Sequence, residues 1–124
     1  MRLLLDTNVL IAWLTDRRLS AEARGAIADP TNDAVVSVIA LWEMAIKQGV
    51  RKLDLAIPTD GELEELGFGL LAVTSRDAHR MATLPLHHRD PFDRMLVAQA
   101  LGESLTLVTS DRAMASYGVA IIVA

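Results

Sequence analysis

Residues 90–108 read Asp-Pro-Phe-Asp-Arg-Met-Leu-Val-Ala-Gln-Ala-Leu-Gly-Glu-Ser-Leu-Thr-Leu-Val, a helix signal followed closely by a strand signal. Asp90 is a good N-cap and Pro91 suits the first helical position, so we expect a helix from here to about Gly102. The apolar run over residues 105–108 then predicts a buried strand. Helices that alternate with buried strands are typical of an α/β domain with a parallel sheet.

The rest of the chain repeats this alternation of short apolar runs and segments with helical spacing. Further strands are expected over residues 2–5, 34–36, 70–73 and 120–123. Further helices are expected over about residues 8–15, 20–28, 38–48, 60–66 and 75–84, the second, fourth and fifth of them capped by Ser20, Asp60 and Ser75. Strands that are joined by helical crossovers run parallel, so the carboxyl ends of these strands should share one edge of the sheet.

Length and composition favour one α/β domain over residues 1–124 that works in the cytoplasm. The chain has no cysteine for disulfides or thiolate zinc ligands, residues 1–15 lack the features of a secretory signal, and no apolar stretch approaches the roughly 18–20 residues of a membrane span. Hydrophobic residues make up 52% of the chain, above the usual share of about 45–50%. We therefore expect a homodimer in which helices from the 20–28 or 60–84 regions bury part of this apolar surplus.

The formal charge of −4 gives the molecule no net field that would attract nucleic acid. Any contact with phosphate must therefore come from a local patch. Four arginines against three aspartates occur within residues 76–94. This segment is the best candidate for such a patch.

Four carboxylates occur where a parallel sheet could bring them together. Asp6 and Asp111 each follow a predicted buried strand, and the carboxyl ends of parallel strands are where ligands bind in open α/β sheets. Glu43 interrupts an otherwise apolar helical segment, and Asp93 lies in the first turn of the helix that Asp90 caps. Acidic groups that converge repel one another unless a cation holds them, so we expect these four residues to bind a hard divalent metal ion.

Each carboxylate also has a purely structural explanation. Asp6 and Asp111 could simply cap the helices that follow them, and Asp93 could favour the helix dipole. Glu43 could pair with Lys47 one turn further along the same helix. Taken alone, none of these positions indicates a metal site, but the expected placement of all four at one sheet edge favours one.

Four motifs follow one another along nearly the whole chain. They are Asp6-Thr7-Asn8, Trp42-Glu43 with Lys47, the block His88-Arg89-Asp90-Pro91-Phe92-Asp93-Arg94, and Thr109-Ser110-Asp111. In this order and spacing they resemble the motifs of PIN-domain ribonucleases, and within that family the short, single-domain toxins of the VapC type. The Asp-Pro-Phe-Asp-Arg block is the most specific of the four, whereas Asp-Thr-Asn alone would be weak.

The resemblance implies a three-layer α/β/α sandwich with a five-stranded parallel sheet, and Mg²⁺- or Mn²⁺-dependent cleavage of RNA. The family's four acidic positions match Asp6, Glu43, Asp93 and Asp111. Asp90 would then be the helix cap, and Thr109 would brace the pocket. Asp6 and Asp93 would bind the metal directly, while Glu43 and Asp111 would act through water, a second ion or the attacking water. The basic residues that could contact phosphate are Lys47, Arg89 and Arg94.

The resemblance also implies a small antitoxin protein that blocks the acidic pocket. We expect it to place an Arg or Lys among the carboxylates, and to lay an apolar helix beside Trp13 and Trp42.

Several other functions share parts of this pattern. A receiver domain has a similar length, but it needs an acidic pair after the first strand and a lysine after the fifth, and neither is present. A dehalogenase-like phosphatase needs a second acid where Asn8 stands. A housekeeping PIN nuclease without a toxin role, and a catalytically silent RNA- or protein-binding domain on the same fold, both stay open.

Overall fold

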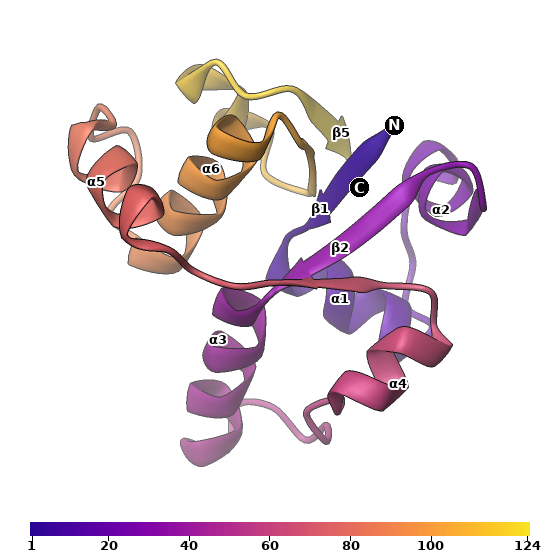
Figure 1. Cartoon of the computed structure of the whole chain (residues 1–124). Coiled ribbons are helices and arrows are strands. Elements are labelled where there is room, and N and C mark those ends of the chain that lie inside the picture. Colours follow the sequence, from indigo (N-terminus) through magenta and orange to yellow (C-terminus); the bar gives the residue numbers. More distant parts are fainter.

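A five-stranded sheet forms the centre of the computed structural model, which describes all residues from 1 to 124 (Figure 1). The strands are β1 (Arg2–Leu5), β2 (Asp33–Ser37), β3 (Gly69–Leu71), β4 (Thr106–Thr109) and β5 (Ile121–Val123). Their order is β3-β2-β1-β4-β5, and every neighbouring pair is parallel. Leu5 pairs with Val36 on one side and with Val108 on the other, so the central strands end nearly level at their carboxyl ends. The predicted parallel sheet is confirmed.

Helices cover both faces of this sheet, which gives the expected α/β/α sandwich. They are α1 (Thr7–Leu14), α2 (Ala21–Ala28), α3 (Val38–Gly49), α4 (Asp60–Glu65), α5 (Ser75–Thr83), α6 (Pro91–Glu103) and the short 3₁₀ helix η1 (Arg112–Tyr117). Figure 1 shows α5 and α6 on one side of the sheet, and α1, α2 and α4 on the other.

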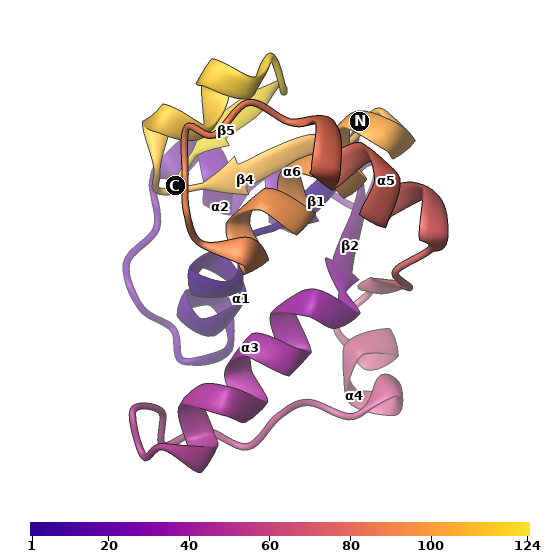
Figure 2. The ribbon, with the colours of Figure 1, turned by 90° about the vertical axis from the view of Figure 1, so that its left-hand side faces the viewer.

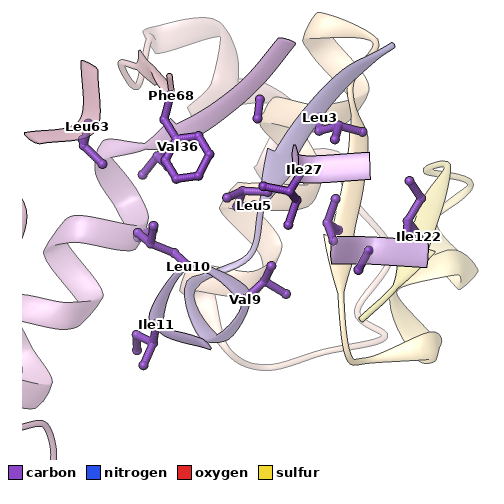
Figure 3. Close-up of a cluster of buried hydrophobic side chains, with 14 of the residues drawn as sticks. Leu3, Leu5, Val9, Leu10, Ile11, Ile27, Val36, Leu63, Phe68 and Ile122 are labelled. Carbon is purple, nitrogen blue, oxygen red and sulfur yellow. The ribbon is translucent and has the colours of Figure 1, made fainter. Parts of the chain in front are cut away.

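Two buried clusters of hydrophobic side chains hold these layers together. Successive side chains of a strand point to opposite faces, and β1 follows this rule. Leu3 and Leu5 join the cluster that contains residues of α1, α2 and α4, which Figure 3 shows in part. Leu4 joins the second cluster, which α6 and η1 complete. Because β1 is buried on both faces, the end of this strand is a rigid place for a functional side chain.

Two N-caps differ by one residue from the sequence prediction, although α4 and α5 begin at the expected residues 60 and 75. Thr59, and not Asp60, is the N-cap of α4, because its hydroxyl and the side chain of Glu62 form a capping box. Likewise Thr74, and not Ser75, caps α5, because Asp77 completes a capping box there. In both places a threonine one residue upstream takes the role that we assigned to the next polar residue.

Other boundaries moved slightly. Helix α3 ends at Gly49, one residue beyond the expected end at residue 48. Strand β3 covers Gly69–Leu71 and not residues 70–73, so Val73 lies outside it. The predicted caps Ser20 and Asp90 are confirmed. None of the helices combines the length and the apolar character that a membrane crossing requires.

Candidate active site

Asp6 lies directly after β1, at the carboxyl edge of the sheet. Its side chain is 6% exposed and accepts two hydrogen bonds: Oδ1 from the backbone N–H of Asn8 at 2.8 Å, and Oδ2 from the hydroxyl of Thr109 at 2.6 Å. The first of these makes Asp6 the N-cap of α1, so the structural role we considered is real. The second bond comes from the end of β4 and fixes the carboxylate across two neighbouring strands.

Burial raises the pKa of the Asp6 carboxyl above its ordinary value. The hydrogen bonds from Thr109 and Asn8 oppose this rise, and the negative charge of Glu43 adds to it. The carboxylate is therefore held rigidly in a place where its own negative charge is costly. A nearby cation would relieve that cost.

Glu43 reaches the same place from α3. Its Oε1 accepts a 2.7 Å hydrogen bond from the hydroxyl of Thr7, the first residue of α1. Its Oε2 lies 3.0 Å from Nζ of Lys47, which is the intrahelical pair that we weighed as the structural explanation. The pair is present, but the contact with Thr7 also directs Glu43 toward the start of α1. Figure 2 shows α1, α3 and α6 on this side of the molecule, where α3 packs against both of the others.

Asp93 enters from the first turn of α6. Oδ1 of Asp90 caps the helix by accepting from the backbone N–H groups of Phe92 and Asp93, at 2.8 Å and 3.3 Å. The carboxylate of Asp93 itself accepts no hydrogen bond from the chain. Burial raises its pKa to about 7, with further contributions from the negative charges of Asp90, Asp6 and Glu43. Asp93 is therefore a free oxygen donor that burial and the surrounding carboxylates make hard to ionise.

Asp111 is set apart from the other three carboxylates. It is the N-cap of η1, and its Oδ1 accepts from the backbone N–H of Ala113 at 3.0 Å. Its Oδ2 lies 2.8 Å from Nε2 of His88, and this hydrogen bond lowers the pKa of the Asp111 carboxyl. The side chain is 44% exposed, and its charge is not among those that raise the pKa of Asp93. Asp111 lies at the margin of the group that Asp6, Glu43 and Asp93 form.

The three basic candidates have different surroundings. Lys47 pairs with Glu43 beside the carboxylates, and Arg89 is exposed on the loop before α6. Arg94 does not fit the phosphate contact that we expected. Its guanidinium is buried and donates to three backbone carbonyls, those of Pro85 at 2.8 Å, Met81 at 3.1 Å and Leu84 at 3.3 Å. It ties the end of α5 to α6 and leaves no side for a substrate.

The sequence did not reveal the role of His88. Its adjacent partner His87 and the surrounding polar loop gave no sign of a contact with Asp111, which is 23 residues further along the chain. Only its place two residues before Asp90, in the most specific motif of the chain, could have drawn attention to it.

The oxygen donors suit a hard divalent ion. As the side chains lie, no three of the His, Asp or Glu residues form a group that could hold a metal ion. Mg²⁺ needs few protein ligands, however, because it usually keeps several waters and binds one or two carboxylates. Asp6 and Asp93 supply two such carboxylates, and both have raised pKa values that a cation would lower. The donor set therefore fits Mg²⁺ or Mn²⁺.

Known proteins are similar to this chain in sequence and in fold. Ribonuclease VapC22 of Mycobacterium tuberculosis is 31% identical over 118 residues, which are 92% of this chain and 90% of the relative. Among solved structures, VapBC2 from Rickettsia felis bound to a DNA fragment from its promoter matches with a TM-score of 0.74 at 16% identity, over 100% of this chain and 99% of that one. DNA-bound VapBC from Salmonella typhimurium matches with a TM-score of 0.67 at 20% identity, over 98% and 97% of the two chains.

The solved structures match at low sequence identity, so they support the fold alone. The profile of the PIN domain matches residues 3–120, which is nearly the whole chain. Together with the similarity to Ribonuclease VapC22, this match confirms the resemblance found in the four motifs. The chain belongs to the PIN-domain family.

Proposed function

We propose that this chain is a Mg²⁺- or Mn²⁺-dependent endoribonuclease of the cytoplasm and the toxin of a toxin–antitoxin pair. The observation that carries the proposal is the convergence of Asp6, Glu43 and Asp93 from the end of β1, from α3 and from α6 at one sheet edge, where burial and the negative charges of Asp90, Asp6 and Glu43 raise the pKa of Asp93. The similarity to a protein named as a ribonuclease supports RNA as the substrate. The whole of residues 1–124 would act as a single catalytic domain.

In this proposal Asp6 and Asp93 hold the metal ion. A bound divalent ion neutralises charge on the phosphate and makes water easier to deprotonate near neutral pH. The chain's own groups prepare the site for this. Thr109 and Asn8 fix the orientation of Asp6, while Thr7 and Lys47 fix that of Glu43. Asp111 would orient the attacking water or help to hold a second ion.

A cleavage assay on single-stranded RNA tests this function. The wild-type protein should cut RNA in Mg²⁺ or Mn²⁺, lose activity in excess EDTA and regain it when the ion is restored. Asp6→Asn and Asp93→Asn should each abolish cleavage while the melting temperature stays the same or rises, since removal of a carboxylate relieves repulsion. Cleavage that persists in EDTA, or full activity of either variant, contradicts the proposal.

The antitoxin is proposed to cover the acidic site. The solved structures with this fold include VapBC complexes, and one from Klebsiella pneumoniae is described as a toxin–antitoxin complex. An apolar groove of about 220 Å³ lies between α3, α5 and α6, and its lining includes Trp42 and Phe92, the sequence neighbours of Glu43 and Asp93. Trp42, the neighbour of Glu43, lines this groove and is 59% exposed. Its ring packs edge-on against that of Phe92, with ring centroids 5.4 Å apart. The groove would suit the apolar helix of a partner.

Trp13 offers less to such a partner than we expected. It is only partly exposed, packs against Phe68 with ring centroids 6.2 Å apart, and has the guanidinium of Arg24 over its ring. The groove at Trp42 is therefore the better candidate for the apolar contact.

Expression in the native host tests the toxin role. The chain alone should arrest growth, and co-expression with the small gene next to it should restore growth. If the wild-type chain is harmless at levels where it cleaves RNA in vitro, it is a housekeeping nuclease.

A further inference from the structure

His88 connects three parts of the molecule through its side chain and its backbone. The residue lies in the loop between α5 and α6. Its ring Nε2 is 2.8 Å from Oδ2 of Asp111, and its ring Nδ1 is 3.2 Å from the hydroxyl of Tyr117. Its backbone N–H donates to the same hydroxyl at 2.7 Å. Asp111 and Tyr117 are the N-cap and the last residue of η1, so His88 contacts both ends of that helix.

The ionised carboxylate of Asp111 can only accept, so it selects the neutral ring of His88 that carries its proton on Nε2, and the hydroxyl of Tyr117 is compatible with that form. The tyrosine hydroxyl has one proton to give, and the backbone N–H of His88 occupies one of its lone pairs. The hydroxyl proton is then free to be donated to Nδ1. A neutral ring with Nδ1 as acceptor carries its own proton on Nε2. Nε2–H faces the carboxylate of Asp111, whereas the other tautomer would place two lone pairs against each other.

Asp111 needs this contact to keep its orientation. It follows β4 and is the N-cap of η1, a helix of only six residues, and its side chain is 44% exposed. The cap to Ala113 occupies only Oδ1. Its backbone is fixed to the site, since its N–H donates to the hydroxyl of Thr109, which in turn donates to Asp6. The hydrogen bond from His88 is therefore the one that restrains Oδ2.

We propose that His88 is a positioning residue that fixes the carboxylate of Asp111 through a hydrogen bond from its ring Nε2–H. This inference rests on the proposed nuclease function, in which Asp111 serves the reaction. It assigns His88 no contact with the metal or with RNA. Its proposed effect on cleavage passes through Asp111, and its only other influence on the carboxylates is that its charge lowers the pKa of Asp93.

Substitutions at His88 separate this role from a purely structural one. His88→Ala keeps the backbone N–H that anchors the loop to Tyr117, so the fold should be retained. His88→Gln keeps an N–H donor at the same number of bonds from the backbone as Nε2, and should recover most of the activity. His88→Asn keeps a polar group only at the position of Nδ1, cannot reach Asp111, and should behave like the alanine variant.

Steady-state cleavage of a fluorophore–quencher RNA oligonucleotide of randomised sequence provides the main measurement. His88→Ala should lower kcat by about 10- to 100-fold, the usual effect of removing a residue that orients a catalytic group. The apparent KM should stay within about threefold, since no contact with RNA is lost. Asp54→Ala, an exposed residue of the loop between α3 and α4, is the control and should cleave like the wild type.

The double variant identifies the route of the effect. In an Asp111→Asn background, His88→Ala should cost nothing further, because the two residues act as one unit. A similar loss in both backgrounds, wild-type activity of His88→Ala, or failure of His88→Gln to exceed His88→Asn each overturns the proposal.

A measurement without activity keeps the inference testable if no RNA is cut. Long-range ¹H–¹⁵N NMR of the metal-free protein, at a pH where the ring is neutral, should find the His88 proton on Nε2. Asp111→Asn should reduce that preference. A proton on Nδ1 in the wild type contradicts the inference, whether or not the chain is a nuclease. An absence of RNA cleavage alongside the Nε2 tautomer counts against the proposed function and leaves the geometry of His88 supported.

Discussion

The hydroxyl of Thr109 donates a 2.6 Å hydrogen bond to Oδ2 of Asp6, and this buried contact joins residues that are 103 positions apart. It connects the carboxyl ends of β1 and β4, the two central strands of this sheet edge. Asp6 therefore has a defined orientation before any ligand is bound. Preorganisation of this kind lets a site bind a cation without first ordering its ligands.

The first prediction concerns this bond. Thr109→Val keeps the shape of the side chain but removes the donor to the buried Asp6 carboxylate and the acceptor of the Asp111 backbone N–H. Unfolding in urea should show a loss of about 1–3 kcal/mol, the usual cost of an unsatisfied buried group, and RNA cleavage should fall. Thr106→Val in the same strand is the control, because Thr106 begins β4 at the end away from Asp6. Equal stability of the two variants would show that the bond to Asp6 is unimportant.

The second prediction concerns the pH dependence of stability. The pKa of Asp93 is about 7 in the folded chain, against an ordinary value of 3.8. The folded state thus holds the proton of Asp93 more tightly than the unfolded state does. The stability that this adds is fully present below pH 4 and is lost as the pH rises through 7. In EDTA at pH 8, Asp93→Asn should therefore stabilise the protein by about 1 kcal/mol, after allowance for solvent screening.

Thermal melts at two pH values check this prediction. The gain in melting temperature of Asp93→Asn should disappear at pH 4, where the wild-type carboxyl is protonated when folded. Asp111→Asn should have the opposite sign at pH 8, because the pKa of Asp111 is lowered by His88 and its ionised form stabilises the fold. A gain for Asp93→Asn that is the same at both pH values would mean that the cost of ionising the buried Asp93 carboxyl is not its cause.

The third prediction separates two arginines of the specific motif. Arg94→Ala removes the donors to three backbone carbonyls at the end of α5 and should cost about 2–4 kcal/mol of stability. Amide hydrogen exchange in α5 should become faster. Arg89→Ala, on the exposed loop, should change stability by less than about 0.5 kcal/mol and raise the KM for RNA if this residue contacts phosphate. Equal effects of the two substitutions on stability would contradict the structural role given to Arg94.

The fourth prediction is a homodimer. The 60–84 region, which we expected to supply part of the interface, contains three large and exposed apolar residues, Leu66, Leu70 and Val73. Light scattering at micromolar concentration should give twice the 13.5 kDa of one chain, and Leu70→Glu should yield monomers. Leu86→Glu, on the loop after α5, is the control and should leave the dimer intact. A wild-type monomer under these conditions rules out the dimer.

The fold could be predicted because its signals are local. The strand at Leu3–Leu5, the cap at Asp90 and the periodic helices are each defined by neighbouring residues. The N-caps assigned to Asp60 and Ser75 were wrong by one residue, since a threonine just upstream forms a capping box in each case. Such competition between adjacent polar residues is decided by backbone geometry that the sequence does not display.

The site could be predicted only in part. Asp6 and Asp93 follow a strand end and a helix cap, so their places on the sheet edge follow from the topology. The bond between His88 and Asp111 depends on the path of the loop before α6, which carries no periodic signal. Arg94 looked like a phosphate ligand because its charge was visible in the sequence, whereas the three carbonyls that occupy it belong to the backbone of another segment.

Binding of Mn²⁺ by isothermal titration calorimetry at pH 7.5 tests most directly whether Asp6, Glu43 and Asp93 form a cation site. The wild-type chain should bind the ion and release protons as it does so, because a cation lowers the raised pKa values of Asp6 and Asp93. Asp6→Asn and Asp93→Asn should each abolish the binding heat, while Asp54→Asn, an exposed acid far along the chain from these residues, should leave it unchanged. Equal binding of Mn²⁺ by the wild type and by Asp93→Asn would contradict the account.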